Sequence, residues 1–466
     1  MKLLLVQPYH PSSVTLWGRA YMSQLTLPLL AAYTPPDVEI EIRDENVDKL
    51  DFDAPVDLVG ITALTSSAPR AYEIADTFRA RGVPVVLGGV HPTLLPDEAK
   101  AHADAVVLGE AENIWAQVVR DAEQGQLEPF YCATERPDMK NLAIPRRDLA
   151  NQKKYIPLQK MEVSRGCPFN CSFCSTTVFF GSRMRYRPVE EIVAEAELLR
   201  GKGTATIFFT DNNIVGSPRY AKQLFRALAP VGIQWCSQGA LNLARDDELM
   251  DLARESGCVG MLIGFESLSP DSLAEAGKKT NRVEEYEQAV QRLHDHGIAI
   301  IGCFVMGFDH DDPTTFDRTA EFVERTNIDV PQITVLTPFP GTELRRQLES
   351  QGRILSNDWS LYDAVHVLIR PQRMSPLELR AGYERMCNQL YSHQSILRRT
   401  LRSTRYLPPN LALSYYGVNL VYRRLYQVGL KDNDMARVRG YMNLTETQKR
   451  GTIRATAPLV GSGVPG

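Results

Sequence analysis

The sequence predicts an α/β protein made of two parallel-sheet units followed by a mainly helical region. Short apolar, β-rich runs alternate with helix-like stretches from residue 2 to residue 125, and the same alternation begins again near residue 160. Runs that are apolar throughout are typical of parallel strands buried on both faces. Prolines interrupt the residues between the two units, which indicates a linker. The predicted segments are a first unit at 1–125, the linker at 126–159, a second unit at 160–345, a helical cover at 346–450 and a disordered tail at 451–466.

The first unit has the spacing of a doubly wound, flavodoxin-like or Rossmann-like layer. Helices are expected between its strands, for example at 69–81 and 96–103. Ligands of such sheets bind outside the carboxyl ends of the strands, and glycine or hydroxyl residues gather at these ends here. The expected strands are 2–6, 38–43, 58–62, 83–87 and 105–108.

Length and composition are those of an ordinary multidomain globular protein. The chain has 466 residues, a net charge of -4, 44% hydrophobic and 23% charged residues. A nucleic-acid-binding protein usually shows a strongly basic domain, so we expect no nucleic-acid partner. The first apolar run is too short for a signal peptide, and no run reaches the length of a membrane span. We expect a cytoplasmic protein.

Three cysteines in one short loop are the strongest chemical signal. Cys167, Cys171 and Cys174 follow the first expected strand of the second unit with the spacing C-x3-C-x2-C. Iron–sulfur clusters are usually held by four cysteine thiolates, so three ligands leave one iron of a [4Fe-4S] cluster open. The alternative, a structural zinc site, needs four ligands. The other cysteines stand singly, and a reducing compartment disfavours disulfides; they are Cys132, Cys236, Cys258, Cys303 and Cys387.

This loop, with an aromatic residue before its last cysteine, resembles that of the radical S-adenosylmethionine (SAM) superfamily. The resemblance implies that Cys167, Cys171 and Cys174 bind a [4Fe-4S] cluster and that SAM chelates the open iron. It also implies that Phe173 lies against the adenine. In that family an electron from the cluster cleaves SAM to a 5′-deoxyadenosyl radical, which requires an external one-electron reductant of the flavodoxin or ferredoxin type.

The second unit resembles the partial (β/α)6 barrel, of the TIM type, of that superfamily. Catalytic residues of such barrels lie at the carboxyl ends of strands. The resemblance implies SAM contacts there by Asp211, Gln238, Glu266 and Met306. Each polar side chain has the alternative of a helix cap or a buried network, and Asp211 in particular can cap the next helix. The expected strands are 160–164, 206–210, 233–237, 259–265, 298–306 and 331–337, with helices such as 188–200 and 283–296.

The strand ends of the first unit resemble a cobalamin-binding domain. Thr62-x-Leu64 stands where that family has S-x-L, and Gly88-Gly89 matches its glycine pair. The D-x-H-x-x-G motif is missing, which leaves His10 a weak candidate for cobalt ligation. The alternative is a layer used for packing or for another nucleotide. The predicted cobalamin contacts are Thr62, Leu64, Thr65, Ser66, Gly88, Gly89, His91, Gly109 and Glu110. For His91 the alternative is that it caps the turn that begins at Pro92.

The C-terminal region begins with a capping box at Ser375 and Glu378, which predicts a helix from 376 to about 392. Residues 385–431 are rich in arginine and tyrosine and contain no Asp or Glu. Such a stretch can lie on an anionic membrane or cover a hydrophobic substrate. We favour a helical subdomain whose arginines pair with acidic residues elsewhere. Residues 359–374 resemble the extra domain of hopanoid methylases and related lipid enzymes.

Together the two resemblances predict a cobalamin-dependent radical SAM enzyme of the methylase branch. The expected reaction is methylation of an unactivated carbon of a small-molecule or lipid-like substrate, through methylcobalamin and a 5′-deoxyadenosyl radical. The alternative is a cyclisation or other rearrangement with the same cofactors. A methylthiotransferase is disfavoured because no cysteine precedes Cys132. A non-enzymatic cobalamin sensor or electron carrier would leave the open iron unused. The substrate is not predicted.

Overall fold

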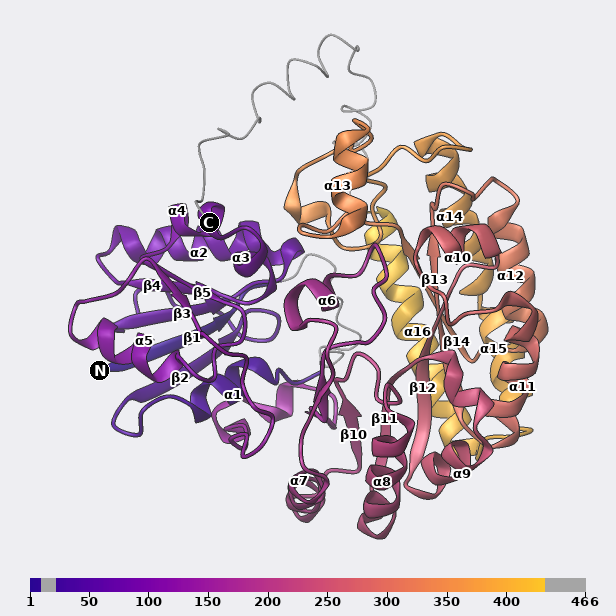
Figure 1. Ribbon diagram of the computed structural model, residues 1–466, viewed down its shortest axis with the longest axis horizontal. Coiled ribbons are helices and arrows are strands. Elements are labelled where there is room, and N and C mark those ends of the chain that lie inside the picture. Colours follow the sequence, from indigo (N-terminus) through magenta and orange to yellow (C-terminus); the bar gives the residue numbers. More distant parts are fainter. Residues whose placement is uncertain (10–21, 432–466) are drawn as a thin grey trace.

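A computed structural model describes residues 1–9 and 22–431. They form two lobes, an N-terminal sheet lobe and a barrel lobe, which meet along one side (Figure 1). His10 and the predicted tail at 451–466 lie outside the described residues.

The N-terminal lobe is built on a six-stranded parallel sheet with the order β2-β1-β3-β4-β5-β6. Five strands were expected. The sixth, β6, falls inside the predicted linker. It was not predicted because it has three residues, of which only Tyr131 is buried, and this gives too weak an apolar pattern. The strands are β1 (Lys2–Gln7), β2 (Glu39–Asp44), β3 (Leu58–Thr62), β4 (Val85–Gly88), β5 (Ala105–Leu108) and β6 (Phe130–Cys132).

Helices cover both faces of this sheet, so the layer is doubly wound as predicted (Figure 1). One apolar core lies between the sheet and helices α2 and α4, and a second lies between the sheet and helices α1 and α5. The helices are α1 (Thr26–Ala32), α2 (Ala68–Ala80), α3 (Val90–Leu94), α4 (Pro96–His102) and α5 (Trp115–Glu123).

The barrel lobe has a second six-stranded parallel sheet, with the order β14-β13-β12-β11-β10-β7. The expected strand 160–164 is wrong in its bounds. The strand observed there, β7, begins at Leu158 and ends at Met161. Ser164 belongs instead to a two-stranded antiparallel sheet of β8 and β9. The strands are β7 (Leu158–Met161), β8 (Ser164–Arg165), β9 (Arg185–Tyr186), β10 (Thr206–Phe209), β11 (Gln234–Gly239), β12 (Cys258–Glu266), β13 (Ala299–Met306) and β14 (Val330–Val335).

Amphipathic helices pack against this sheet and enclose the largest apolar core of the protein. The barrel helices are α6 (Ser175–Phe180), α7 (Val189–Gly201), α8 (Pro218–Leu228), α9 (Asp247–Glu255), α10 (Pro270–Glu275), α11 (Tyr286–Asp295) and α12 (Thr315–Thr326). The C-terminal region is mainly helical, as predicted, with α13 (Glu343–Ser350), α14 (Pro376–Leu390), α15 (His393–Ser403) and α16 (Pro409–Lys431). The capping box of Ser375 and Glu378 starts α14.

Helix α16 is fixed to the barrel sheet by tyrosine hydroxyls. Tyr415 donates to the carbonyl of Val259 over 3.0 Å, and Tyr422 donates to Gln332 over 2.9 Å. Because a buried hydroxyl without a partner is unfavourable, these bonds specify where the helix docks. No helix among the described residues has both the length and the apolar character needed to cross a bilayer.

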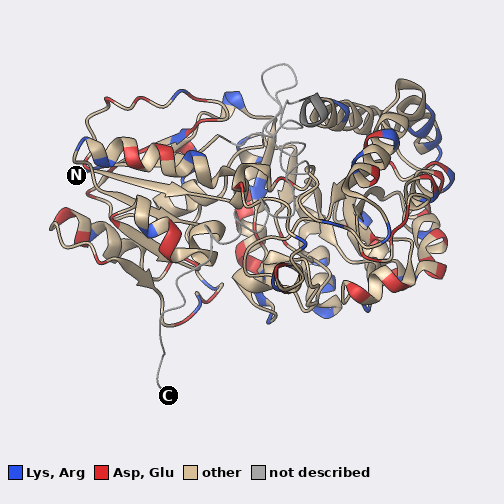
Figure 2. Cartoon of the chain, turned by 90° about the horizontal axis from the view of Figure 1, so that it is seen from above, with Lys and Arg blue, Asp and Glu red and all other residues tan. Residues whose placement is uncertain are grey.

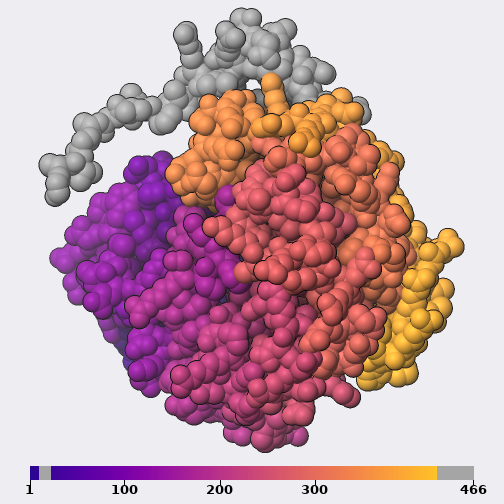
Figure 3. Space-filling view, turned by 45° about the vertical axis from the view of Figure 1, so that its right-hand side comes forward, coloured from indigo at the N-terminus to yellow at the C-terminus, as the bar shows by residue number. Residues whose placement is uncertain are grey.

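The C-terminal region also contacts the N-terminal lobe (Figure 3). The indole of Trp359, in the short 3-10 turn Trp359–Leu361, donates to Glu98 of α4 over 3.1 Å. At Gly341 the backbone has φ +75°, and an added Cβ would lie 3.1 Å from Val178 of α6 and 3.2 Å from Leu94 of α3. The turn before α13 therefore packs where the two lobes and α6 meet.

We expect Gly260→Ala to lower the free energy of unfolding by about 1–3 kcal/mol, a typical overpacking penalty. A Cβ at Gly260 would overlap the Tyr415 hydroxyl oxygen. Gly201→Ala is the matched control, because this helical glycine has open space around its Cβ position. Thermal unfolding of both variants measures the difference. Tyr415→Phe should rescue part of the loss in the Gly260→Ala background, and equal stability of the two glycine variants would contradict the packing argument.

Candidate functional site

The cysteine loop lies between β8 and α6 and is held from two sides. Ser172, between Cys171 and Cys174, donates its N–H to the Ala276 carbonyl at the end of α10 over 3.0 Å. Its own carbonyl accepts from the N–H of Leu344, in the first turn of α13, over 2.9 Å. The loop is therefore positioned by backbone bonds to segments that are distant in the sequence.

The residue before the first cysteine must be glycine. Gly166 has φ +95°, and a Cβ there would lie 2.6 Å from the Arg183 carbonyl oxygen. This close approach brings Cys167 against the turn between α6 and β9, where its N–H donates to the Gly181 carbonyl over 3.4 Å.

The three thiols have the chemistry that an iron–sulfur cluster needs. Cys171 is buried, while Cys167 and Cys174 are half-buried. Burial raises the pKa of the Cys171 thiol to about 11 and also raises that of Cys167, and the Lys278 ammonium opposes both shifts. Among the described residues no three His, Cys, Asp or Glu are grouped tightly enough to hold a single metal ion. A four-iron cluster does not require this, because each cysteine binds a different iron. The donor set thus fits a cluster.

Glu266, at the end of β12, is the predicted SAM contact whose negative charge helps to raise the pKa of the Cys171 thiol. It has φ +66°, rare for a residue with a side chain, and the β12–β13 register shifts between Gly264 and Glu266. Bulges of this kind redirect side chains beside active sites. Gly264 has no Cβ, which leaves room for the Glu266 carboxylate to fold back over it.

Lys278 lies beside Glu266 and was not named by the sequence analysis. Its Nζ lies 2.7 Å from Glu266 Oε1, and both side chains are largely buried. Burial alone would lower the pKa of Lys278, but the charges of Glu266 and of the Cys171 thiolate leave it raised. Gly277, with φ +68°, brings this segment to the loop, since a Cβ there would lie 3.2 Å from the Asn170 carbonyl oxygen. In the sequence, the only local indication of this lysine is the glycine directly before it, Gly277.

The remaining predicted SAM residues differ in their surroundings. Phe173 packs edge-on against Phe308, with ring centroids 6.0 Å apart. Gln238 is half-buried at the end of β11. Met306 is 1% exposed and belongs to the barrel core, with its carbonyl accepting from the Leu336 N–H. These three do not share one environment.

Asp211 is fully buried behind the cysteine loop. Its carboxylate accepts from the Ser164 hydroxyl over 2.5 Å and from the Val163 N–H over 3.1 Å. It therefore joins the residues after β10 to β8 and to Val163, which lies between β7 and β8. Both carboxylate oxygens of Asp211 are bonded to protein groups, and the side chain is not exposed to a cleft in which SAM could reach it. Burial raises the pKa of Asp211 to about 7 against the opposing hydrogen bond from Ser164.

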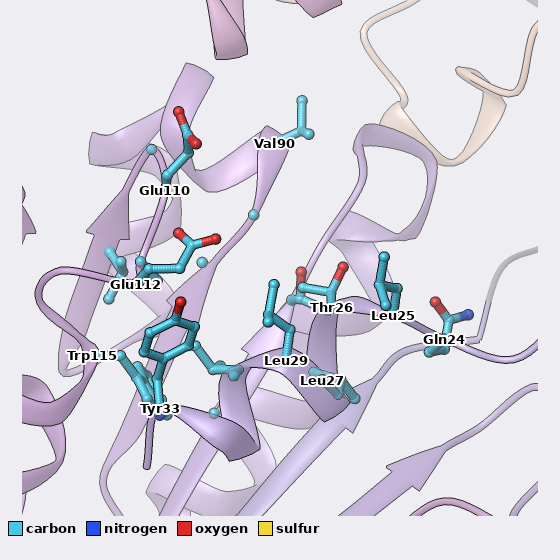
Figure 4. A pocket seen from close by; sticks show the side chains of 18 of the residues that line it. Gln24, Leu25, Thr26, Leu27, Leu29, Tyr33, Val90, Glu110, Glu112 and Trp115 are labelled. Carbon is cyan, nitrogen blue, oxygen red and sulfur yellow. The ribbon is translucent and has the colours of Figure 1, made fainter. Parts of the chain in front are cut away.

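A pocket of about 350 Å³ opens at the carboxyl ends of the N-terminal sheet. Leu29 of α1 lines one side of it, and Glu110 and Glu112 line another, where Tyr33, the residue after α1, lies next to Glu112 (Figure 4). Six of the nine predicted cobalamin contacts line it: Thr62, Leu64, Gly88, Gly89, Gly109 and Glu110. At Gly89, with φ +96°, a Cβ would meet Thr62 Oγ1 at 2.7 Å. A mostly apolar pocket with backbone exposed at strand ends fits the nucleotide tail of cobalamin.

The barrel lobe completes this pocket. Phe179 and Phe180 at the end of α6 contribute to the lining, as do Lys160 and Arg165. Lys160 was not predicted as a site residue. Burial lowers the pKa of Lys160, and the charge of Asp44 opposes the shift. The pocket is therefore shared by the two lobes and carries a desolvated cation from β7.

A buried group of charges joins the lobes beside the pocket. Figure 2 shows how acidic and basic residues are distributed along the chain as a whole. Glu110 accepts from Arg165 over 2.6 Å and from Arg185 over 2.6 Å. Arg165 also contacts Glu112 at 2.5 Å and Glu162 at 2.8 Å. Glu110 was predicted as a cobalamin contact; the structure adds that its carboxylate is engaged by arginines of the barrel lobe.

Three predicted cobalamin contacts, Thr65, Ser66 and His91, do not line the pocket. Thr65 and Ser66 lie in a short 3-10 turn, Thr65–Ser67, that packs against the turn at Trp359. His91 is 0% exposed, and its Nε2 lies 3.2 Å from Glu98 Oε1. His91 lies outside the pocket because α3 directs its side chain toward Glu98 of α4. The sequence motif does not specify this direction.

Comparisons with known proteins match both units. The radical SAM superfamily model matches residues 161–323, and the B12-binding domain model matches residues 27–119. A solved cobalamin-dependent SAM radical enzyme, OxsB, covers 97% of this chain and 78% of its own at a TM-score of 0.68 and 14% identity. The predicted fold is confirmed. The fold and the cysteine loop define a radical SAM enzyme with a cobalamin-binding domain, whose cofactors are a [4Fe-4S] cluster, SAM and cobalamin.

Sequence relatives give the particular family. The bacteriochlorophyllide d C-12(1)-methyltransferase of Chlorobaculum tepidum is 35% identical over 85% of this chain and 89% of its own. The C-8(2)-methyltransferase of the same organism is 32% identical over 82% of this chain and 88% of its own. The chain belongs to the cobalamin-dependent radical SAM methyltransferases. A hopanoid C-2 methylase of Rhodopseudomonas palustris and an anaerobic magnesium-protoporphyrin IX monomethyl ester cyclase of Rubrivivax gelatinosus are 26% and 27% identical.

Asp211→Asn should change how stability depends on pH. The folded pKa of Asp211 is raised to about 7, so the unfolded chain releases this proton first as the pH rises. The stability that the protonated carboxyl contributes is complete below pH about 4 and is lost as the pH rises through about 7. Between pH about 5 and 7, wild type should lose up to about 1.4 kcal/mol per pH unit relative to Asp211→Asn. Thermal unfolding of both cluster-free proteins measures this, and a pH-independent difference would contradict it.

Lys278→Met should slow reductive SAM cleavage by about tenfold or more, since residues that support a metal site typically contribute this much. The change leaves Glu266 charged and buried without its partner. Lys279→Met is the matched control, because Lys279 is exposed one residue further along. 5′-Deoxyadenosine formation is measured together with the cluster's iron content and redox potential. Equal rates for the two variants would remove Lys278 from the site.

Proposed function

We propose that this protein transfers a methyl group to an unactivated carbon on a side chain of a cyclic tetrapyrrole. Two relatives above 30% identity are both named as methyltransferases of bacteriochlorophyllide d, at two different positions. The proposed substrate class is therefore a large, flat, partly hydrophobic ring with small alkyl substituents. This narrows the small-molecule or lipid-like substrate that the sequence predicts.

One observation carries the proposal: α6 connects the cysteine loop directly to the pocket of the N-terminal lobe. Cys174 is the residue before α6, while Phe179 and Phe180 at its other end line the pocket of the N-terminal lobe. A helix of six residues spans little more than a turn and a half. A substrate at this junction can therefore contact both cofactors at once.

The bound cofactors supply hydrogen abstraction from the substrate carbon and a methyl group to replace that hydrogen. The chain positions them. We assign Cys167, Cys171 and Cys174 to three irons of the cluster and Phe173 to the adenine. We assign Glu266 to the SAM ammonium or ribose, because a carboxylate accepts hydrogen bonds from either. Lys278 holds the Glu266 carboxylate in place over 2.7 Å.

The assignments at the other predicted positions follow their surroundings. Gln238 remains a proposed SAM contact at the end of β11, and Met306 contributes only through its backbone. For Asp211 we propose the structural role of joining β8 to β10, because both carboxylate oxygens are engaged.

For cobalamin we propose contacts by the six pocket residues and, in addition, by Lys160. Lys160 is half-buried and lines the pocket, and its ammonium suits the phosphate of the nucleotide tail. His91, Thr65 and Ser66 act in lobe contacts. The external one-electron reductant and a cytoplasmic location stay proposals, and so do the segment boundaries at 125, 159, 345 and 450.

A second candidate is cyclisation of a tetrapyrrole side chain. The observation that favours it is the 27% identical relative named as a magnesium-protoporphyrin IX monomethyl ester cyclase, which matches 69% of this chain. Both candidates use the same cofactors and the same substrate class. They differ in the product: methylation adds one carbon, whereas ring closure adds none.

The test is an anaerobic assay of the protein reconstituted with iron, sulfide and hydroxocobalamin. Bacteriochlorophyllide d and magnesium-protoporphyrin IX monomethyl ester are offered separately with SAM and a reductant. Methylation predicts a product heavier by one CH2, together with 5′-deoxyadenosine and S-adenosylhomocysteine. A product without added carbon would favour the cyclase.

Cys171→Ala is the control variant. It should abolish 5′-deoxyadenosine and product while cobalamin binding is retained, because the pocket residues lie apart from Cys171. SAM cleavage without any change in either pigment would contradict the substrate class. Loss of cobalamin binding in Cys171→Ala would contradict the separation of the two cofactor sites.

A further inference from the structure

Helices α15 and α16 present an apolar surface to solvent on the barrel lobe. Leu397 and Leu401 of α15 are 51% and 61% exposed, and Leu413 of α16 is 66% exposed. Leu397 and Leu401 stand four residues apart and so lie on one helix face. The two helices pack against each other. Single exposed leucines are common, but here three stand on two helices that pack against each other, and we call the outer face of this helix pair the α15–α16 patch.

This patch is rigid. The inner face of α16 is fixed to the sheet through Tyr415 and Tyr422, and the inner face of α15 through Arg399, which is 0% exposed and donates to Asn419 over 2.9 Å. The outward leucines are therefore held on a well-anchored pair of helices. Figure 3 shows part of α16 on the surface of the barrel lobe.

Arginines surround the leucines. Arg398 and Arg405 are exposed beside Leu397 and Leu401, and Arg424 is exposed on α16. Residues 385–431 contain no Asp or Glu, so α15 and α16 themselves contribute only positive charge to this surface. The arginines of residues 385–431 were expected from the sequence to pair with acidic residues elsewhere, and only some of them do. Arg398 and Arg399 lie 3.6 Å from Glu324, whereas Arg405 and Arg424 have no acidic partner within the described part of the chain.

We propose that the α15–α16 patch docks on an anionic lipid bilayer. Leucine side chains enter the boundary between headgroups and acyl chains, and the arginines bind lipid phosphates at its edge. Each arginine near such a membrane adds attraction, because the anionic leaflet has a negative surface potential. An acidic protein or a nucleic acid would satisfy the arginines but would leave the leucines in contact with polar groups. The bilayer matches both.

Docking would hold the enzyme at the surface of the membrane. The geometry is that of a helix pair lying in the plane of the interface, and it requires no membrane-spanning segment. It is independent of the proposed substrate, since it depends only on the exposed leucines and arginines.

The test is flotation of the full-length protein with vesicles of phosphatidylglycerol and phosphatidylcholine, compared with phosphatidylcholine alone. We expect binding to the anionic vesicles that weakens with salt. Arg405→Gln with Arg424→Gln should lower the partition coefficient by roughly tenfold or more. Leu401→Gln with Leu413→Gln should lower it by a similar factor without changing charge.

The matched controls are Leu198→Gln and Arg219→Gln, which change exposed residues of α7 and α8 and should leave binding unchanged. Circular dichroism and cobalamin binding show whether each variant is folded. Three outcomes would overturn the proposal: no partition of wild type, equal loss in the control variants, or partition that appears only after residues 432–466 are removed. Self-association that the leucine variants abolish, without lipid binding, would assign the surface to a second copy of the chain.

Discussion

The buried ion pair between Glu110 and Arg165 is the contact on which the arrangement of the site depends. Glu110 follows Gly109, directly after β5, and Arg165 stands two residues before Cys167. Their 2.6 Å contact therefore connects the rim of the pocket to the start of the cysteine loop. Each member has further partners, Arg185 for Glu110 and both Glu112 and Glu162 for Arg165, so the pair is the centre of a buried charge network. Apolar packing alone would allow the lobes to slide, whereas paired charges fix one register.

The strained end of β12 shows how the barrel lobe holds a carboxylate beside the loop. A residue with a side chain in the left-handed region costs of order 1–3 kcal/mol and persists only where its surroundings enforce it. Here Asn281 donates to the carbonyls of Gly264 and Phe265, and Lys278 binds the Glu266 carboxylate. The bulge is thus braced through its backbone and through its side chain. Such bracing is expected where a side chain must be presented to a ligand rather than to its own strand neighbours.

Local patterns predicted what depends on local sequence. Strands β3 and β5 begin and end where their apolar runs do, and the cysteine spacing located the loop. Features that depend on distant pairing were missed. Lys278 becomes informative only once β12 places Glu266 beside it, and β6 needs β5 as a neighbour. His91 stands at a motif position next to the pocket, but packing against Trp359 turns its side chain away.

Several attachments between the lobes make sense because the reaction requires three bound groups in one place. The charges around Glu110 act on one side of the junction, the turn at Gly341 acts at α6, and Trp359 acts at α4. Each uses a different part of the chain, and the last two come from the region after the barrel. A misplacement of about 1 Å can cost about a hundredfold in rate when reacting groups must be aligned. The C-terminal region therefore does more than cover the barrel, because it contacts both lobes and so helps to hold them in one arrangement.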